Sequence, residues 1–360
     1  MTRALELAAQ AGRAAAPNPL VGAVIVRNGE ILAEGYHTKY GAPHAEVEAF
    51  KALGNAPLNG NESLYVTLEP CSHFGKTPPC VDAILRSGIR HVVVGCRDPF
   101  PEVSGNGIEK LRAHGIQVEE DLLRSECVFL NRRFFIRHIQ KRPYIILKWA
   151  QTSDGYIARK DGTSKWISNE ASRKLTHSWR AHESSILVGS RTALIDDPEL
   201  TVRHVSGENP IRLLLDRGNI VPSHAQILNE CAPTLHFSSY EESNSHPTTA
   251  RYEQIRVRSD QSPITAICTE LYSRGVLSVM IEGGSELLRQ FIIAGLWDEA
   301  RVFICPLLFG EGLHAPTLST PPSRETLLAG DVLHWFVNPN LLNLLGCVSP
   351  IEDPLTPLTS

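Results

Sequence analysis

The chain has 360 residues, of which 42% are hydrophobic and 21% charged, and its formal net charge is −4 at pH 7. At roughly 100–200 residues per domain this length predicts about two domains, and the composition excludes a disordered, collagen-like or coiled-coil chain. Acidic residues slightly outnumber basic ones, so we expect no nucleic-acid partner. No apolar run reaches about 18 residues, so we expect no membrane span.

Residues 1–19 are rich in alanine but contain Glu6 and no continuous apolar run. This pattern favours an amphipathic helix over a secretory signal. The eight cysteines are too few for a disulfide scaffold and are typical of a reduced intracellular protein. The cytoplasm is therefore the expected compartment.

Strand-like and helix-like segments alternate along the chain, which predicts an α/β fold. Two apolar runs joined by Asn28-Gly29 predict a β-hairpin over residues 21–36. In this half we expect further strands at 63–68, 91–95 and near Val118, and helices at 44–53, 79–87, 107–114 and up to Arg137. The basic segment 131–142 is predicted to be a solvated helix face and linker, the alternative being a phosphate-facing or interdomain surface.

A second alternation begins after Arg142-Pro143. We expect strands at 144–148, 185–189, 211–216, 234–237, 277–281 and 301–305, and helices at 172–182, 264–273 and 285–294. The predicted domains are residues 1–142 and 143–335. Residues 336–360 contain several prolines without a clear period, so we expect an irregular tail.

One histidine and two cysteines of the first half stand where a helix is expected to begin or a strand to end. His44-Ala45-Glu46 opens one helix, Cys71 follows a strand, and Cys80 opens the next helix. One imidazole and two thiolates suit zinc, and three protein ligands leave a fourth position for a water molecule. Glu46 is then placed to carry protons without binding the metal, as in zinc deaminases. The alternatives are a buried histidine with two core thiols, or a structural zinc site, which would need a fourth ligand.

The motifs around these residues resemble the bifunctional riboflavin-biosynthesis deaminase/reductase family. The resemblance is carried by Pro17–Val26, Gly35–His37, Pro43–Val47 and Thr67–Cys80, and it includes the wide C-x8-C spacing of Cys71 and Cys80. It implies a cytidine-deaminase-like three-layer α/β/α domain followed by a dihydrofolate-reductase-like α/β domain. It also implies zinc and NADPH as cofactors, a pyrimidine ribosyl phosphate as substrate, and a homo-oligomer.

For the first domain, the resemblance implies that His44, Cys71 and Cys80 bind zinc and that Glu46 is the proton shuttle. The substrate would be 2,5-diamino-6-ribosylamino-4(3H)-pyrimidinone 5′-phosphate, hydrolysed at its 2-amino group. The positions that would surround the pyrimidine or its phosphate are Asn18, His37, His73 and Lys76. A turn role for Asn18, a solvated charge at Lys76 and support of the metal loop by His73 remain alternatives.

In the second half the clearest local feature is the apolar strand that enters Gly283-Gly284 before a helix. Such a turn lets a phosphate approach free N–H groups, although a plain turn is the alternative. It is not G-x-G-x-x-G, so a Rossmann domain is not indicated.

For this half, the resemblance implies the remaining contacts. NADPH would bind near Ala150, Trp166, Thr192, Asp196, Gly284, Ser285, Glu286, Leu287 and Leu288. The ribosyl phosphate would bind near Ser164, Arg180, Leu200, Arg203 and Glu282. Lys148, Asp196 and Glu282 are the candidates for catalysis of the reduction, with their individual roles left open.

The second half also departs from the family pattern. Thr152-Ser153-Asp154-Gly155 replaces Ser-Leu-Asp-Gly, and Arg217 follows Asp216 where a small hydroxyl residue is usual. Arg217 could strengthen selection for the 2′-phosphate of NADPH.

The alternative function of the whole chain is a single-activity zinc nucleobase deaminase with an accessory C-terminal domain.

Overall fold

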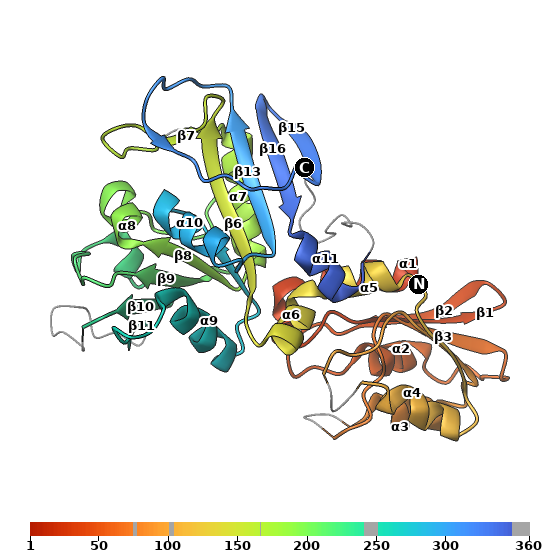
Figure 1. The fold of residues 1–360 in the computed structure, drawn as a ribbon. Helices are drawn as coiled ribbons and strands as arrows, with labels where there is room; N and C mark the ends of the chain where they lie inside the picture. Colours follow the sequence, from red (N-terminus) through yellow and green to blue (C-terminus); the bar gives the residue numbers. More distant parts are fainter. Residues whose placement is uncertain (75–77, 101–103, 166, 241–250, 348–360) are drawn as a thin grey trace. The chain divides into compact units, whose positions relative to one another are not determined.

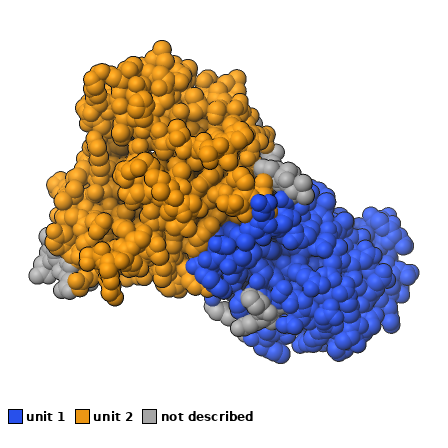
Figure 2. Space-filling model, viewed as in Figure 1, with its two compact units in different colours: residues 1–141, 343–357 blue, residues 142–342, 358–360 orange. Residues whose placement is uncertain are grey.

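The computed structural model describes residues 1–74, 78–100, 104–165, 167–240 and 251–347. The chain divides into two compact units (Figure 2). Unit 1 contains residues 1–141 and the described residues 343–347, and unit 2 contains residues 142–342. The division after Lys141 lies next to the domain boundary expected at Arg142-Pro143.

Unit 1 is built on a five-stranded mixed sheet with the strand order β2-β1-β3-β4-β5. Its strands are β1 (Gly22–Arg27), β2 (Glu30–Tyr36), β3 (Glu62–Val66), β4 (His91–Val94) and β5 (Gln117–Glu119). β1 runs antiparallel to both β2 and β3, whereas β3, β4 and β5 are parallel. The predicted hairpin is present: Asn28 and Gly29 have φ values of 51° and 84°, which a tight type I′ turn requires.

Helices cover both faces of this sheet, which gives the predicted three layers (Figure 1). On one face lie α1 (Thr2–Gln10), α5 (Arg124–Leu130) and α6 (Arg132–Gln140), and on the other lie α2 (Ala45–Leu53), α3 (Cys80–Ser87) and α4 (Asn106–Ala113). A short 3-10 turn, η1 (Gly12–Ala15), follows α1. Alternate residues of β1 point to the two helical layers. Ala23 and Ile25 pack with α2 and α3, and Val24 packs with α1.

The basic segment 131–142 forms α6 and does not have the fully solvated face that we expected. Arg132 is completely buried and Arg133 is 9% exposed. The Arg132 guanidinium donates a 3.0 Å hydrogen bond to the carbonyl of Phe129 and lies 4.5 Å from the centre of that ring. Burial of the Arg132 charge is tolerated because the hydrogen bond and the face of the Phe129 ring compensate it.

Unit 2 contains a nine-stranded sheet with the order β11-β10-β9-β8-β12-β6-β13-β16-β15. The seven strands from β11 to β13 are parallel, and β16 and β15 continue the sheet antiparallel. The strands are β6 (Tyr144–Thr152), β8 (Ser185–Gly189), β9 (Ile211–Leu215), β10 (Thr234–Ser238), β11 (Tyr252–Arg256), β12 (Ser278–Ile281), β13 (Glu299–Cys305), β15 (Arg324–Leu328) and β16 (Asp331–Val337). A separate pair joins β7 (Tyr156–Ala158) to β14 (Leu313–His314).

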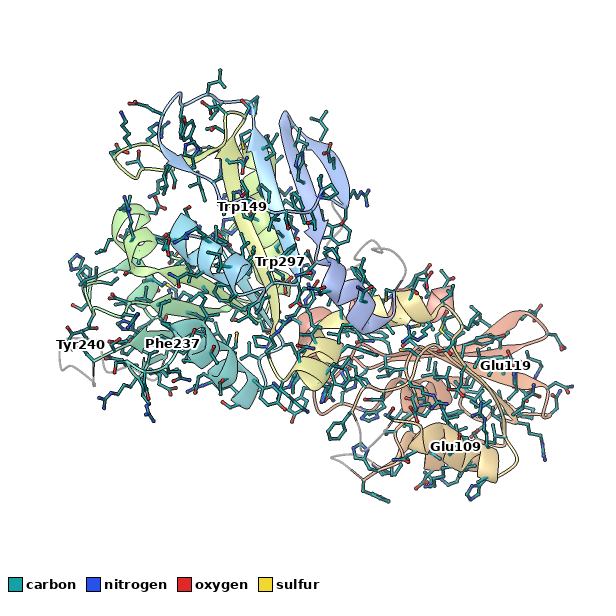
Figure 3. All side chains as sticks on the ribbon, in the orientation of Figure 1. Glu109, Glu119, Trp149, Phe237, Tyr240 and Trp297 are labelled. Atoms are coloured by element: carbon teal, nitrogen blue, oxygen red, sulfur yellow. The ribbon has the colours of Figure 1, made fainter. Side chains whose placement is uncertain are left out.

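The helices of unit 2 connect the parallel strands, as a parallel sheet requires. They are α7 (Glu170–His182), α8 (Ser190–Asp196), α9 (Pro263–Ser273) and α10 (Ser285–Ile293), with the short 3-10 turn η2 (Gln226–Leu228). The central strands contain apolar runs, Tyr144–Leu147 in β6 and Val279–Ile281 in β12, because both faces of the sheet are buried there. Trp149, Phe237 and Trp297, labelled in Figure 3, belong to the core of this unit.

The C-terminal segment differs from the irregular tail expected for 336–360. Residues 336 and 337 complete β16, and α11 (Pro339–Leu345) follows. β15 was not predicted because every second residue of this edge strand is exposed, including Leu327 at 74%. Residues 348–360 lie outside the described part of the chain. Among the described residues, no helix combines the length and apolar character that crossing a bilayer requires.

The close approach of β2 to α2 depends on Gly35. A Cβ at this position would lie 2.3 Å from the Ala49 nitrogen and 2.5 Å from the Ala45 oxygen, both of them backbone atoms. Gly35→Ala should therefore lower the free energy of unfolding by about 1–3 kcal/mol, although alanine usually stabilises a strand. Urea unfolding followed by circular dichroism measures this.

The matched control is Ile31→Ala on the same strand, where the side chain is 49% exposed. It should cost less than about 1 kcal/mol. A Gly35→Ala protein as stable as the parent would show that the two elements are not packed as described.

Candidate functional site

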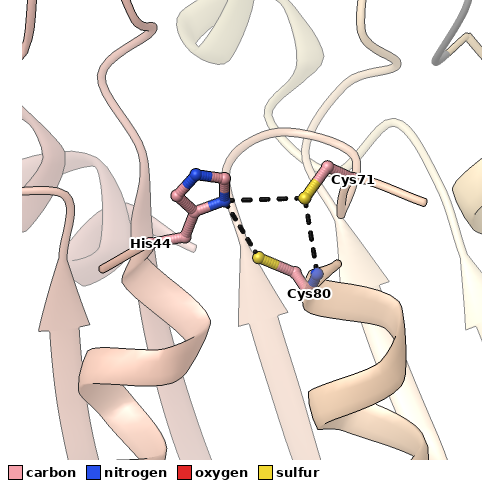
Figure 4. A group of neighbouring side chains, drawn as sticks. All are labelled: His44, Cys71 and Cys80. Carbon is pink, nitrogen blue, oxygen red and sulfur yellow. Dashed lines mark hydrogen bonds between the residues drawn. The ribbon is translucent and has the colours of Figure 1, made fainter. Parts of the chain in front are cut away.

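In unit 1, three side chains with metal-binding atoms converge at one end of the sheet (Figure 4). His44 is the N-cap of α2, Cys80 is the first residue of α3, and Cys71 lies between β3 and α3. His44 Nδ1 is 3.1 Å from Cys80 Sγ and 3.5 Å from Cys71 Sγ. All three donor atoms lie within 4.8 Å of one another. The residues expected to bind zinc are therefore together.

The charge of this cluster favours a cation. Hydrogen bonding from Cys80 is the main cause that lowers the pKa of Cys71 to about 4, and His44 lowers it further against the effect of burial. The backbone N–H of Cys80, at the start of α3, donates to Cys71 Sγ at 3.4 Å. A thiolate is the form of cysteine that binds metals. One nitrogen and two sulfur donors fit zinc.

The donor set also distinguishes an open site from a closed one. Within the described ranges, the group contains three donors and no fourth histidine, cysteine or carboxylate. A structural zinc site normally has four protein ligands. Three ligands leave one position for a water molecule, so the arrangement fits a catalytic metal.

Glu46 lies in the first turn of α2, two residues after His44, and is only 3% exposed. Burial is the main cause that raises the pKa of Glu46, and the negative charge of Cys71 raises it further. In such surroundings the carboxyl group holds a proton more readily than an exposed glutamate does.

Two further predicted residues lie beside the cluster. Asn18 Nδ2 and His37 Nε2 are 3.0 Å apart, and His37 Nδ1 lies 3.0 Å from the carbonyl oxygen of Pro43. The ring of His37 meets that of His44 edge-on, with 5.5 Å between their centres. Burial lowers the pKa of His37. The other two differ: His73 is exposed, and Lys76 lies outside the described residues.

Sequence reasoning missed the role of Glu69, which precedes Pro70-Cys71. Its buried carboxylate accepts backbone N–H bonds at 2.9–3.3 Å from four residues at or before the start of α4: Asp98, Gly105, Gly107 and Ile108. These bonds hold the Cys71 loop against α4. The only signal in the sequence is the acidic residue beside the ligand, because its partners are distant in the chain.

In unit 2, most of the residues expected to bind cofactor or phosphate line one cavity of about 1250 Å³. The expected residues on its wall are Lys148, Ala150, Ser164, Arg180, Thr192, Asp196, Leu200, Arg203, Glu282, Gly284, Ser285, Glu286 and Leu287. Several of them follow the carboxyl ends of the parallel strands β8 and β12. Such crevices are the usual ligand sites of parallel sheets.

A buried carboxylate, Glu282, forms part of this wall. Arg180 binds both oxygens of Glu282 at 2.7 Å, and Lys148 Nζ lies 3.8 Å from one of them. Burial alone would raise the pKa of Glu282, but Arg180 and Lys148 outweigh it and lower the pKa to about 2. Burial lowers the pKa of Lys148. Glu282 is therefore ionised at neutral pH.

Asp196 lies elsewhere on the same wall, at the end of α8. Its two oxygens each accept from Ser164 Oγ at 3.2 Å, and its backbone oxygen accepts from Lys165 Nζ at 2.7 Å. Burial raises the pKa of Asp196. The pKa values of two carboxyl groups of the cavity, Asp196 and Glu282, are thus shifted in opposite directions.

The Gly283-Gly284 turn brings α10 close to α8. A Cβ on Gly283 would lie 2.9 Å from Thr192 Cγ2, and Gly284 has a φ of 78°. The first N–H groups of α10 have no partner within the helix, and the residues that carry them, Ser285 to Leu287, line the cavity. Free N–H groups at a helix start suit a diphosphate, so the turn fits a dinucleotide cofactor.

One expected cofactor contact does not line this cavity, and another lies outside the described residues. The Leu288 side chain is completely buried in the core and its N–H bonds to Gly284 O at 3.0 Å, so this side chain does not line the cavity. Leucine at this point of the helix faces the sheet rather than the cavity. Trp166 lies outside the described residues.

His177 was not predicted, and no motif in the sequence marks it. Its Nδ1 accepts the N–H of Arg203 at 3.1 Å. Burial is the main cause that lowers the pKa of His177 to about 4, with Arg180 and Arg203 adding to it. The imidazole is therefore neutral at pH 7 and holds the backbone of a predicted phosphate-binding residue.

Together these features define a zinc deaminase-like domain and a cofactor-binding reductase-like domain in one chain. Residues 1–96 match the cytidine and deoxycytidylate deaminase zinc-binding region, and residues 143–335 match the RibD C-terminal domain. The chain belongs to the RibD family of riboflavin biosynthesis proteins. It is accordingly a bifunctional deaminase and reductase with zinc and NADPH as its cofactors. The accessory-domain alternative is not favoured, because the second match is itself a RibD domain.

Similar proteins cover nearly the whole chain. The riboflavin biosynthesis protein RibD of Aquifex aeolicus is 44% identical over 91% of this chain and 92% of its own length. RibD of Escherichia coli is 37% identical, with 91% and 92% covered. One similar solved structure is a crystal structure from Thermotoga maritima, and its sequence is 39% identical to this chain. It is named as a diaminohydroxyphosphoribosylaminopyrimidine deaminase/5-amino-6-(5-phosphoribosylamino)uracil reductase. It superposes with a TM-score of 0.83 over 93% of this chain and 96% of its own.

The pH dependence of stability tests the buried carboxylate. Because the pKa of Glu282 falls from 4.5 to about 2 on folding, its charge stabilises the fold fully above pH 4.5 and loses this effect as the pH falls through about 2. Glu282→Gln should cost about 3–5 kcal/mol near neutral pH, since Arg180 and Lys148 lose their partner. The difference from the parent should shrink between pH 4.5 and pH 2, measured by urea unfolding with tryptophan fluorescence.

Glu170→Gln, at an exposed position of α7, is the control and should show no comparable trend. A Glu282→Gln difference that grows as the solution is acidified would contradict the assigned charge.

Proposed function

We propose that this chain removes the 2-amino group of 2,5-diamino-6-ribosylamino-4(3H)-pyrimidinone 5′-phosphate and then reduces the ribosyl group to ribityl. The observation that carries the proposal is the pairing of an open His-Cys-Cys cluster beside a buried glutamate with a separate cavity for a dinucleotide. The name of the similar Thermotoga maritima protein contains both activities.

In the deaminase domain, His44, Cys71 and Cys80 would hold zinc. Zinc, when bound there, supplies a water molecule whose pKa is lowered to about 7. Glu46 would accept a proton from the attacking water and would donate a proton to the amino group, which leaves as ammonia. Its burial next to the ligands suits this exchange, because its carboxyl group holds a proton more readily than an exposed glutamate does.

The neighbouring polar residues would orient the pyrimidine. Asn18 carries both a donor and an acceptor for a ring edge, and its contact with His37 fixes its direction. We assign His73 and Lys76 to the phosphate of the substrate by resemblance.

In the reductase domain, NADPH would supply a hydride to C1′ of the ribosyl group, and the ring oxygen would take a proton as its bond to C1′ breaks. The N–H groups of Ser285, Glu286 and Leu287 after Gly284 would hold the cofactor diphosphate, with Ala150, Thr192 and Trp166 along its length. The ionised Glu282 would stabilise positive charge near C1′. The proton would come from Lys148 or Asp196.

The contacts of the two expected arginine ligands support different roles for them. Arg180 is bound to Glu282 and to the Thr201 carbonyl, so it acts mainly by holding Glu282 in place. Arg203 is half exposed, and among the described residues its guanidinium pairs only with Glu199. Arg203 is therefore the main ligand that we propose for the ribosyl phosphate, with Ser164 and Leu200 beside it.

The reactants are small molecules, and the proposal includes a cytoplasmic location and a homo-oligomer. The ordinary cysteine content supports the cytoplasmic location, and resemblance alone supports the homo-oligomer. Light scattering on the purified chain measures the oligomeric state directly.

The deaminase assignment predicts a clean separation of metal binding from turnover. Glu46→Gln should lower the rate of ammonia release by about 100- to 10,000-fold, because the proton carrier is lost. The zinc content of the protein, measured by elemental analysis, should stay the same because Glu46 is not a ligand.

Glu48→Gln is the matched control on the same helix, where the side chain pairs with Lys51 at the surface. It should keep the parental rate. Parental ammonia release from a zinc-loaded Glu46→Gln protein would exclude the proposed role.

The reductase assignment predicts that the second step does not need the metal. With the deaminated uracil ribosyl phosphate as substrate, zinc-depleted protein should oxidise NADPH at the parental rate, as followed by absorbance. Lys148→Met should reduce that rate strongly, since a buried cation of the cavity wall is removed. If zinc removal abolished NADPH oxidation in protein that remains folded, this would contradict the claim that the two sites work independently.

A further inference from the structure

The cavity of unit 2 extends along three neighbouring parallel strands, β12, β8 and β9. The residues that follow these strands and line the cavity include Gly284, Arg191 and Arg217, respectively. β9 is two strands away from β12, which is roughly 10 Å at the usual strand spacing. A dinucleotide whose phosphates bind at the start of α10 can therefore bring its adenosine end to β9.

The acidic residue at the end of β9 is turned away from this space. Asp216 is completely buried, and one carboxylate oxygen accepts the N–H of Val221 at 2.8 Å. The same oxygen lies 3.7 Å from His236 Nε2 inside the unit. In the Rossmann domains of NAD-binding enzymes, which are also parallel α/β folds, an acidic residue near the end of a strand binds the 2′-hydroxyl of the adenosine ribose. Asp216 does not line the cavity, so it does not offer this contact.

The next residue, Arg217, faces the cavity instead. Its side chain is exposed, and its guanidinium makes one long contact of 3.5 Å, from Nε to Ser239 Oγ. None of the carboxylates in the described residues forms an ion pair with it. This arginine therefore offers a free fork of donors at the adenosine end of the cavity.

We propose that Arg217 binds the 2′-phosphate of NADPH and makes the reductase select NADPH over NADH. The inference rests on the proposed reductase function and names the residue that determines its cofactor. A guanidinium matches two oxygens of a phosphate with two parallel hydrogen bonds, whereas the neutral 2′-hydroxyl of NADH gains little from it.

The test measures binding rather than turnover. Dissociation constants for NADP⁺, NAD⁺, 2′,5′-ADP and 5′-AMP are determined by calorimetry on the intact chain and on Arg217→Gln. The variant should bind NADP⁺ and 2′,5′-ADP about 10- to 100-fold more weakly, while NAD⁺ and 5′-AMP change by less than about threefold. Arg217→Lys should recover part of the loss, because it restores the charge without the fork.

The control is Arg258→Gln, which removes the same charge from a surface pair with Asp260 outside the cavity wall. It should leave all four constants unchanged. Equal weakening of NADP⁺ and NAD⁺ in Arg217→Gln, or no weakening of either, would overturn the inference. Failure of the parent chain to bind NADP⁺ at all would instead overturn the reductase function.

Discussion

Strands that run in the same direction end at the same edge of a sheet, and both candidate sites depend on this constraint. In unit 1, β2 and β3 are each antiparallel to β1 and so end together. His44 follows β2 and Cys71 follows β3, while Asn18 precedes the start of β1 at the same edge. In unit 2, the ends of β8, β9 and β12 are aligned in the same way. Residues far apart in the sequence therefore meet without any special loop.

The two units differ in the charges that they stabilise at these edges. In unit 1, the start of α3 and the neighbouring groups favour a thiolate at Cys71, which prepares the cluster for a cation. In unit 2, a buried carboxylate is held ionised by Arg180 and Lys148, which suits a reaction that needs fixed negative charge. Glu46 and Asp196 differ from Glu282, because burial dominates and raises the pKa of each.

Residues in compact motifs could be predicted from the sequence, because their spacing reflects local structure. The hairpin at Asn28-Gly29 and the starts of the helices at His44 and Cys80 are examples. Glu69 and His177 could not be predicted, because their partners are backbone groups more than 25 residues away in the chain. β15 was not predicted because an exposed edge strand carries little apolar signal, and the burial of Leu288 was not expected because only the folded helix turns this side chain into the core.

One measurement tests the account most directly. Zinc-loaded protein is mixed with the diamino-ribosylamino-pyrimidinone phosphate and NADPH, and ammonia and NADPH are followed in the same sample. The account predicts that ammonia appears first and that one NADPH is oxidised for each ammonia released, after a lag. NADPH oxidation without ammonia, or ammonia with no oxidation of NADPH, would contradict the claim that this chain performs both steps in that order.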